Sequence, residues 1–446
     1  MIRSVLIANR GEIAVRIIRA CRDLKIRSVL VYSTADKDSL GVSLADQAIC
    51  IGPPATAQSY LNKKNIIAAA CLARCDAIHP GVGFLSENAD FARDVEHAGL
   101  IFIGPKSETI ALLGNKVAAR ATALECNLPI TPGSSEEIRD LDDAISTAER
   151  IGYPIILKAA CGGGGRGMRI VYEKKDLANA LQIAKKEALA FFGDASVHME
   201  RYLENPRHLE IQLLADGQGT VVHLGERDCS VQKNHQKLLE ESPSPILTEE
   251  MRTRMCQDSV KLFEKLGYRG AGTVEYLVEG NQYYFMEVNA RLQVEHPVSE
   301  LVSGLDLVKA QIEIASGKKL TITQDDVRLK GYALECRING KSAGTITDLN
   351  FPLGPHVRID SHLLPNSVLS PYYDPLIAKI IVHTPNRDQG LATMLRALSE
   401  VRIEGIETNL EEQKLLISSV EFGSGRFGTD LYVKLWEKQE KKSRGK

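Results

Sequence analysis

The sequence predicts an α/β protein: an N-terminal doubly wound parallel-sheet domain, a central domain with a mobile lid, and a C-terminal mixed α+β domain. Over the first hundred residues, short apolar runs alternate with helical patterns, which is typical of a parallel sheet with crossover helices. A run of four glycines follows a strand pattern, and further along the chain a short turn joins two strand patterns. After about Lys330 a further β-containing region begins and ends in helical patterns.

The N-terminal pattern starts with a strand at residues 3–8 and a helix at residues 12–24, in which apolar residues recur at helical spacing. Further strands are expected at residues 28–32, 48–51, 77–78 and 101–104. Such a fold often holds nucleotides, but the fold alone does not name a ligand. The segment Gly81-Val82-Gly83 lacks the third glycine of the dinucleotide fingerprint, which favours an ordinary glycine turn over a cofactor loop.

The composition is that of an ordinary globular protein. The 446 residues include 44% hydrophobic and 25% charged residues, with a formal net charge of -2. This charge argues against a nucleic-acid-binding protein, which normally carries a basic excess, and the apolar stretches are too short for a membrane span. The nine cysteines show no Cys-x-x-Cys pattern and the first residues do not resemble a signal peptide. We therefore expect a cytoplasmic protein without disulfides or a zinc knuckle.

The glycine run at residues 162–168 is the first chemical signal. Glycines expose backbone N–H groups, so such a loop can close over phosphate oxygens, and Lys158 on the preceding strand adds a positive charge for polyphosphate. No Gly-Lys-Ser/Thr follows, so this is not a Walker loop. The alternative is a flexible hairpin or linker.

Carboxylates on the two later strands are the second signal. Glu287 and Asn289 are two residues apart on the strand at residues 283–289, so both project from one face. Glu275 lies on the partner strand at residues 272–278, close enough to join them. Oxygen ligands without histidine or cysteine suit Mg²⁺ or Mn²⁺ bound to nucleotide phosphates. The alternative is a solvated polar sheet face.

The third signal is the segment Arg291-Leu292-Gln293-Val294-Glu295-His296-Pro297, directly after the metal strand. Arginine can clamp a small oxyanion at two points, and a glutamate beside it can take a proton from that anion. His296, before Pro297, is interpreted as structural. Two further clusters, at residues 230–237 and around Arg337, contain polar residues that could equally be surface charge.

A lid is predicted around the glycine run. The turn-rich segments 131–135 and 204–206 flank it, which suits a small module, residues 131–203, hinged at both ends. In the open state it would admit nucleotide, and in the closed state it would exclude water from a labile intermediate.

These segments together resemble the ATP-grasp family, and within it the biotin carboxylases. The resemblance covers nearly the whole chain and implies domains at residues 1–113, 114–330 and 331–446. The closest likeness is to the free-standing biotin carboxylase subunit of acetyl-CoA carboxylase. The resemblance is carried by residues 7–14, 79–88, 162–168, 200–208 and 287–297.

The resemblance implies two half-reactions. ATP phosphorylates bicarbonate to carboxyphosphate, whose breakdown gives CO₂ and phosphate beside biotin, and the biotin enolate then attacks CO₂. The residues that the resemblance assigns to ATP are Lys116, Lys158, Gly162, Gly163, Gly164, Gly165, Gly167, Met168, Glu200, Arg201, Leu203, His208, Gln232, His235, Glu275, Leu277 and Glu287.

The resemblance also implies the remaining ligand sets. Two Mg²⁺ or Mn²⁺ ions would be bound by Glu275, Glu287 and Asn289, and bicarbonate by Lys237, Arg291, Gln293, Val294 and Glu295. Glu295 would be the general base, and Lys237 and Arg291 would be catalytic with it. Arg337 would bind biotin and stabilise its enolate.

Four positions or segments depart from the pattern that the resemblance leads us to expect: Arg201 in place of lysine, Cys161 before the glycines, Val82 in place of a tyrosine, and a shortened segment at residues 340–357. None removes an expected catalytic group.

No biotinylation motif of the Ala-Met-Lys-Met type occurs, so biotin is expected on a separate carrier protein. A carboxyltransferase is expected as a further partner, and a homodimer is the expected assembly. The rival interpretations are another ATP-grasp ligase that forms an acyl or carbamoyl phosphate, a biotin carboxylase subunit of another acyl-CoA or pyruvate carboxylase, and a nucleotide-binding regulator without activity.

Overall fold

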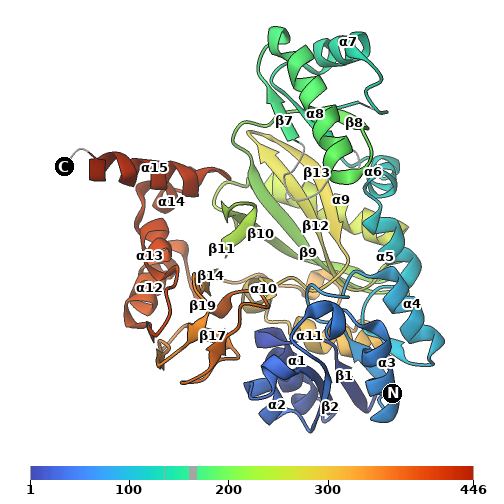
Figure 1. Cartoon of the computed structure of the whole chain (residues 1–446), viewed down its shortest axis with the longest axis vertical. Coiled ribbons are helices and arrows are strands. Elements are labelled where there is room, and N and C mark those ends of the chain that lie inside the picture. The colour runs from blue at the N-terminus through green and yellow to red at the C-terminus, as the bar shows by residue number, and fades with distance from the viewer. Residues whose placement is uncertain (1, 135, 160–167, 445–446) are drawn as a thin grey trace.

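The computed structural model describes residues 2–134, 136–159 and 168–444. Its N-terminal region is a five-stranded parallel sheet in the order β3-β2-β1-β4-β5, as the alternating pattern predicts. Helices pack on both faces of this sheet (Figure 1). The elements are β1 (Ser4–Ile7), α1 (Gly11–Asp23), β2 (Arg27–Ser33), α2 (Leu40–Leu44), β3 (Gln47–Gly52), α3 (Lys63–Leu72), β4 (Ala77–His79), α4 (Ala89–His97), β5 (Ile101–Phe102) and α5 (Ser107–Gly114).

A small lobe projects from the body at the top of Figure 1. Its three-stranded antiparallel sheet has the order β7-β6-β8, and its apolar side chains form a core of their own, as in an independently folded unit. The lobe and the helix before it comprise α6 (Lys116–Glu125), α7 (Leu141–Ile151), β6 (Ile155–Ala159), β7 (Met168–Val171), α8 (Leu177–Phe192) and β8 (Val197–Arg201).

The centre of the molecule is an eight-stranded antiparallel sheet in the order β13-β12-β9-β10-β11-β14-β19-β17. Strands on both sides of Lys330 belong to it, so the C-terminal region extends the central sheet. The central elements are β9 (Arg207–Asp216), β10 (Val221–Lys233), β11 (Gln236–Ser242), α9 (Glu249–Lys265), β12 (Arg269–Glu279), β13 (Gln282–Asn289), α10 (His296–Ser303) and α11 (Leu307–Ala315).

The C-terminal region covers one end of this sheet with helices (Figure 1). Its elements are β14 (Tyr332–Asn339), β15 (Gly344–Thr345), β16 (Asp348–Asn350), β17 (Val357–Ser361), β18 (Val368–Leu369), β19 (Leu376–Thr384), α12 (Arg387–Glu400), β20 (Arg402–Glu404), α13 (Leu410–Ser418), α14 (Val420–Gly423) and α15 (Leu431–Arg444). None of the helices in the described residues has the length and apolar character that a bilayer crossing needs.

Side chains alternate along strand β9 between the hydrophobic core and a polar face of the sheet. Leu209, Ile211 and Leu213 belong to a core that includes side chains of α9, whereas the alternate residues His208 and Glu210 make polar contacts. Because side chains alternate between the two faces of a strand, one run supplies both a core and a functional surface.

Candidate active site

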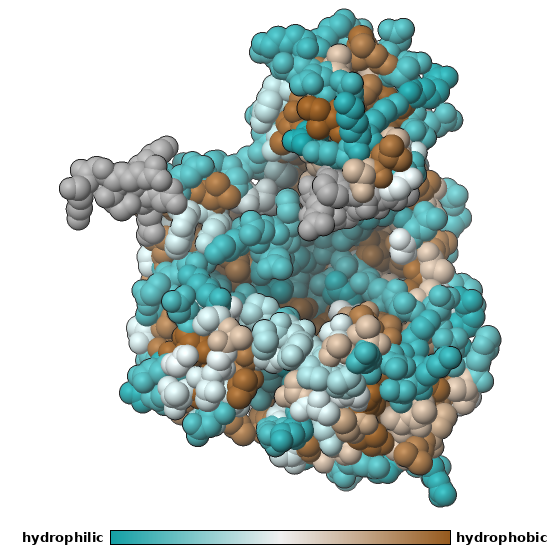
Figure 2. Space-filling model, in the orientation of Figure 1, coloured by the Kyte–Doolittle hydropathy of each residue, from teal (hydrophilic) through white to brown (hydrophobic). Residues whose placement is uncertain are grey.

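A cleft of about 1330 Å³ lies where the lobe, the central sheet and both terminal regions meet. Figure 2 shows this hydrophilic recess below the lobe. Its lining includes Arg10 and Glu12 from the N-terminal region, Lys158 and Glu200 from the lobe, and Arg337 from β14. The cleft is therefore formed by segments far apart in the sequence.

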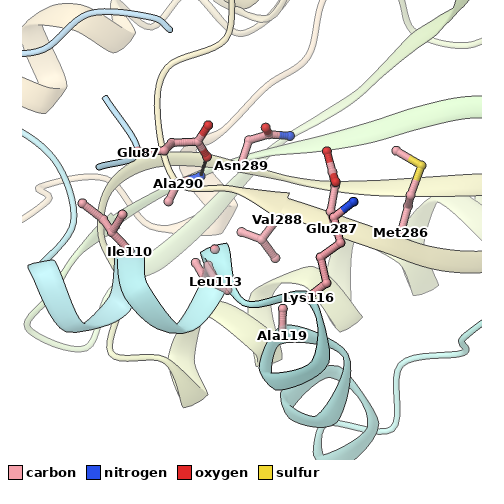
Figure 3. Close-up of a pocket in the computed structure, with 11 residues that line it drawn as sticks. Glu87, Ile110, Leu113, Lys116, Ala119, Met286, Glu287, Val288, Asn289 and Ala290 are labelled. Carbon is pink, nitrogen blue, oxygen red and sulfur yellow. Dashed lines mark hydrogen bonds between the residues drawn. The ribbon is translucent and has the colours of Figure 1, made fainter. Parts of the chain in front are cut away.

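The β12–β13 hairpin brings the expected metal ligands together. Glu275 lies opposite Glu287 and Thr273 lies opposite Asn289, and Asn289 Nδ2 donates to Glu275 Oε1 at 2.8 Å. Figure 3 shows Glu287 and Asn289 extending from one face of β13, with Val288 on the other.

The charges of this hairpin suit a divalent cation. Burial and the charge of Glu275 raise the pKa of Glu287, and in the described residues Glu287 has no hydrogen-bond or ion-pair partner of its own. Burial would also raise the pKa of Glu275, but Lys237 and His208 hold it below its usual range. Two carboxylates and an amide oxygen are ligands that Mg²⁺ prefers, so this donor set fits the expected ion.

The centre of the cleft is a network of charges around Lys237. Its Nζ donates to Glu210 Oε2 at 2.8 Å, to Glu275 Oε1 at 3.0 Å and to Glu295 Oε1 at 2.7 Å. The second oxygen of Glu295 accepts from Arg337 Nη2 at 2.8 Å. Burial alone would raise the pKa of Glu295, but Lys237 and Arg337 hold it well below its usual range. Glu295 is therefore an ionised carboxylate between two cations.

A second cluster near this centre has metal-ligand chemistry, because ligand atoms of Glu210, Cys229 and Glu295 lie within 4.8 Å of one another. Lys237 Nζ contacts both of these carboxylates, so the ammonium group supplies the positive charge there. Burial raises the pKa of Cys229 well above its usual value, which leaves the thiol neutral. We assign no metal to this cluster.

The loop after β13 is held from several sides. Glu87 Oε2 accepts from Arg291 Nε at 2.7 Å, and Arg291 Nη1 donates to Gln293 Oε1 at 3.0 Å. The carbonyl oxygen of Val294 accepts from the fully buried Lys379 Nζ at 2.9 Å. These contacts bring Arg291, Gln293 and Val294 to one wall of the cleft, where an oxyanion would meet a guanidinium group and amides.

His296 is structural, as its position before Pro297 predicts. It is fully buried at the start of α10, and its Nδ1 lies 2.8 Å from the carbonyl oxygen of Gln293. Burial lowers its pKa well below the usual value, so it holds the turn as a neutral ring.

The outer part of the cleft contains the residues expected for ATP. Lys158 Nζ donates to Glu200 Oε2 at 2.5 Å, and Arg120 Nη1 donates to Glu200 Oε1 at 3.1 Å. The backbone N–H of Arg201 is hydrogen-bonded to the carbonyl of Pro132 at 2.8 Å. Met168, Leu203, His208, Gln232, His235 and Leu277 also line the cleft. Gly162, Gly163, Gly164, Gly165 and Gly167 lie outside the described residues.

Lys116 is near the cleft but enters from the other side of β13. It begins α6 and lines a smaller pocket of about 210 Å³ with Glu287, Asn289 and Glu87. Figure 3 shows its side chain pointing toward Glu287. All expected site residues in the described part of the chain therefore lie in or beside the cleft.

Several residues at the site are not predicted from the sequence: Glu87, Arg120, Glu210, Arg227 and Lys379. The alternation of His208, Glu210 and Gln212 between apolar residues is a signal that could have found Glu210. Lys379 belongs to a distant segment, and nothing local marks it. Glu87 lies in the segment 79–88 that carries the resemblance, but nothing in the sequence indicates its contact with Arg291.

Val82 lies at the cleft wall beside Phe84, which stacks on Tyr60 with ring centroids 5.1 Å apart. Tyr372 and Tyr373 line the same region, so aromatic rings remain near the position where Val82 departs from the family pattern.

The chain joins a parallel-sheet domain to a central domain with a projecting lobe, and its cleft contains paired carboxylates and convergent lysines. This combination is typical of ATP-dependent ligases of the ATP-grasp class. Family models match in chain order: the biotin carboxylase N-terminal domain at residues 1–110, the carbamoyl-phosphate synthase L chain ATP-binding domain at 115–323, and the biotin carboxylase C-terminal domain at 337–433. The chain belongs to the biotin carboxylase family, which confirms the resemblance stated from the sequence.

Individual relatives agree with this assignment. Biotin carboxylase 1 of Bacillus subtilis is 51% identical over 96% of this chain and 98% of its own length. A pyruvate carboxylase subunit of Methanothermobacter thermautotrophicus is 45% identical over 96% of this chain and 89% of its own length.

Solved structures have the same fold. The biotin carboxylase of Campylobacter jejuni in a β-γ-ATP complex matches with a TM-score of 0.92 and 43% identity, covering 97% of this chain and 99% of the other. The biotin carboxylase domain dimer of Hydrogenobacter thermophilus 2-oxoglutarate carboxylase, with ADP and bicarbonate, matches with a TM-score of 0.90 and 40% identity, covering 97% and 98%.

Proposed function

We propose that this protein carboxylates biotin on a separate carrier protein, with ATP and bicarbonate as co-substrates, as the first half-reaction of acetyl-CoA carboxylase in cytoplasmic fatty acid synthesis. The observation that carries the proposal is the position of Glu295, whose two oxygens face Lys237 and Arg337. A base between two cations can serve both half-reactions, because one step needs a proton acceptor and the other a stabilised anion.

ATP would occupy the outer cleft. Lys116, Lys158 and the glycine run would contact its phosphates, and the segment from Glu200 to Leu203 would line the adenine. This arrangement is supported by the 2.5 Å contact of Lys158 with Glu200, which leaves the lysine at the cleft wall with a carboxylate that phosphate can replace.

Glu275, Glu287 and Asn289 would bind two Mg²⁺ ions, or Mn²⁺ in their place, together with the phosphates of ATP. When bound, the metal would neutralise phosphate charge and orient the terminal phosphoryl group. The partnerless carboxylate of Glu287 beside Glu275, among the residues that the structure describes, supports this assignment.

Bicarbonate would bind to Arg291, Gln293, the Val294 backbone and Lys237. Glu295 would accept the bicarbonate proton while a bicarbonate oxygen attacks the terminal phosphorus of ATP, giving carboxyphosphate and ADP. Carboxyphosphate would break down to CO₂ and phosphate, the released phosphate would take the N1′ proton of biotin, and the resulting enolate would attack CO₂. Arg337 would stabilise the enolate oxygen through its positive charge.

The test is a bicarbonate-dependent ATP cleavage assay on the purified protein, with and without free biotin. We expect ADP release to require bicarbonate and to rise with biotin, and mass spectrometry to detect carboxybiotin. An ATP-grasp ligase with a different acceptor would not respond to biotin. A nucleotide-binding regulator would not release ADP at all.

The acyl acceptor depends on the partner. Relatives named as a biotin carboxylase, a pyruvate carboxylase subunit and a 2-oxoglutarate carboxylase domain all match this chain, so the carboxyltransferase would select the acceptor. Purification of the protein with its biotinylated partner from the native host, followed by mass spectrometry, tests the acetyl-CoA assignment. Recovery of a pyruvate or 2-oxoglutarate carboxyltransferase would overturn that assignment alone.

The proposed homodimer is tested by the mass of the purified protein in solution.

A further inference from the structure

Two buried carboxyl groups lie behind the catalytic centre on one face of the central sheet. Glu240 on β11 is directly opposite Glu335 on β14, and both side chains are fully buried. Arg337 follows Glu335 by two residues on β14, so its side chain leaves the same face. Neither Glu240 nor Glu335 has a hydrogen-bond partner in the described part of the chain.

Glu240 differs from Glu335 because it contacts Arg337. Its Oε1 lies 2.6 Å from Arg337 Nη2, and Glu295 Oε2 lies 2.8 Å from the same nitrogen. The guanidinium group is therefore held between two carboxylates, one at the cleft and one behind it. A buried guanidinium that lost its only anion would be strongly unfavourable.

The proposed reaction neutralises one of these two carboxylates. When Glu295 accepts the bicarbonate proton, its attraction for Arg337 falls sharply. We propose that Glu240 is a positioning residue for Arg337, which keeps the guanidinium aimed at the biotin enolate while Glu295 is protonated. This inference rests on the proposed function.

The electrostatics of the pair agree with this role. Burial raises the pKa of Glu240 to about 7, and the charge of Glu295 contributes to the rise while Arg337 opposes it. Protonation of Glu295 therefore lowers the pKa of Glu240 and favours its ionised form at the step that needs it.

The variant Glu240→Gln tests the proposal because it removes the charge and nearly preserves the volume. We expect bicarbonate-dependent ATP cleavage without biotin to stay within about twofold of the parent, whereas kcat for biotin carboxylation falls by about 10- to 100-fold, as expected when a close buried charge pair is lost. The KM for ATP should not change. The matched control is Glu335→Gln, which removes the neighbouring buried carboxyl and should leave both rates within about twofold.

A double variant separates positioning from a general structural effect. If Glu240 acts through Arg337, adding Glu240→Gln to Arg337→Ser should cause no further loss of biotin carboxylation. If Glu240→Gln does not fold, as judged by circular dichroism, Glu240→Asp replaces it and should retain part of the carboxylation rate because it keeps the charge.

Equal losses in both half-reactions, equal behaviour of the Glu240 and Glu335 variants, or an additive loss in the double variant would each overturn the inference. A failure of the proposed function is distinguishable, because the parent protein would then show no bicarbonate-dependent ATP cleavage or no response to biotin.

Discussion

At the residue scale, the charge state of each carboxyl in the cleft is set by the cations beside it. Glu295 is buried, yet Lys237 and Arg337 keep it ionised, and a base must be ionised before it can accept a proton. Lys237 has other carboxylates, Glu210 and Glu275, within 3.0 Å. These alternative anions let Lys237 remain in the site when Glu295 becomes neutral.

In the variant Glu295→Gln, the rate of bicarbonate-dependent ATP cleavage should fall by a factor of about 10² to 10⁴, which is the rate enhancement that a positioned base usually contributes. ATP binding should survive, because the proposed nucleotide contacts are elsewhere in the cleft. Steady-state ADP release and equilibrium binding of an ATP analogue measure the two effects. Unchanged turnover would contradict the role of Glu295.

Arg337→Ser should separate the half-reactions. In the proposed mechanism its positive charge is needed when the biotin enolate forms, so carboxyphosphate formation should continue while carboxyl transfer to biotin falls. The assay compares bicarbonate-dependent ATP cleavage without biotin against carboxybiotin formation. If both rates fall by the same factor, Arg337 serves the first step as well.

His362 provides a stability prediction. Burial, with the nearby charge of Arg10, lowers its pKa to about 3, whereas an unfolded histidine titrates near 6.5. Between these values the unfolded chain binds a proton that the folded protein does not, so the free energy of unfolding decreases as pH falls. The slope from this residue is about 1.4 kcal/mol per pH unit.

The test compares urea unfolding of the parent and His362→Gln at several pH values from about 7.5 to about 5, a range chosen to span the titration of an unfolded histidine at about 6.5. The variant should lose less stability on acidification, by about 1.4 kcal/mol per pH unit below that value. Parallel curves would show that His362 does not titrate in this way.

At the element scale, the β12–β13 hairpin places the proposed metal ligands on one face of the sheet. Its register shifts between Glu275 and Tyr276, so Met286 is an extra residue in β13 at a β-bulge. Bulges re-aim side chains next to functional sites. Here the bulge adjoins Glu287, which lies opposite Glu275.

The variant Glu287→Gln should raise the Mg²⁺ concentration needed for half-maximal activity, because a hard anionic ligand becomes neutral. A titration of ATP cleavage against Mg²⁺, repeated with Mn²⁺, measures the shift. Identical metal dependence in parent and variant would show that this strand is not the metal site.

At the scale of the whole molecule, the cleft depends on how three regions meet. The lobe has its own hydrophobic core, and its polar contacts with the rest of the chain include the ion pairs of Arg201 with Glu279 at 3.3 Å and of Glu200 with Arg120 at 3.1 Å. Exposed ion pairs of this kind contribute little stability. The separate core, joined to the body by partly exposed polar contacts, supports the proposal that residues 131–203 form a mobile lid.

Hydrogen exchange tests the lid. Peptides that cover Lys158 and the strand Met168–Val171 should exchange faster without ligand and gain protection with an ATP analogue and Mg²⁺. Peptides from β9 serve as an internal reference, because that strand is buried along its whole length. Equal protection of the lobe in both states would contradict closure on the nucleotide.

Local sequence patterns were enough to predict the N-terminal parallel sheet and the β12–β13 hairpin, and to single out the segment from Arg291 to Pro297 as a candidate site, because strand alternation and residue chemistry are local properties. Those patterns contained no sign that β14, β17 and β19 would join the central sheet, or that a bulge would lie at Met286. Strand order depends on long-range pairing, which local patterns do not encode.

Only the three-dimensional fold decides which charged side chains contact one another. Glu240, Lys379 and Glu87 are ordinary charged residues in the sequence, yet they contact Arg337, Val294 and Arg291 respectively. The physical reason is burial: a charge removed from water needs a partner, and that partner is supplied by whichever distant segment the fold brings within a few ångströms. The chemistry of Glu295 was therefore suggested by its neighbours in sequence, whereas its charge state is fixed by neighbours in space.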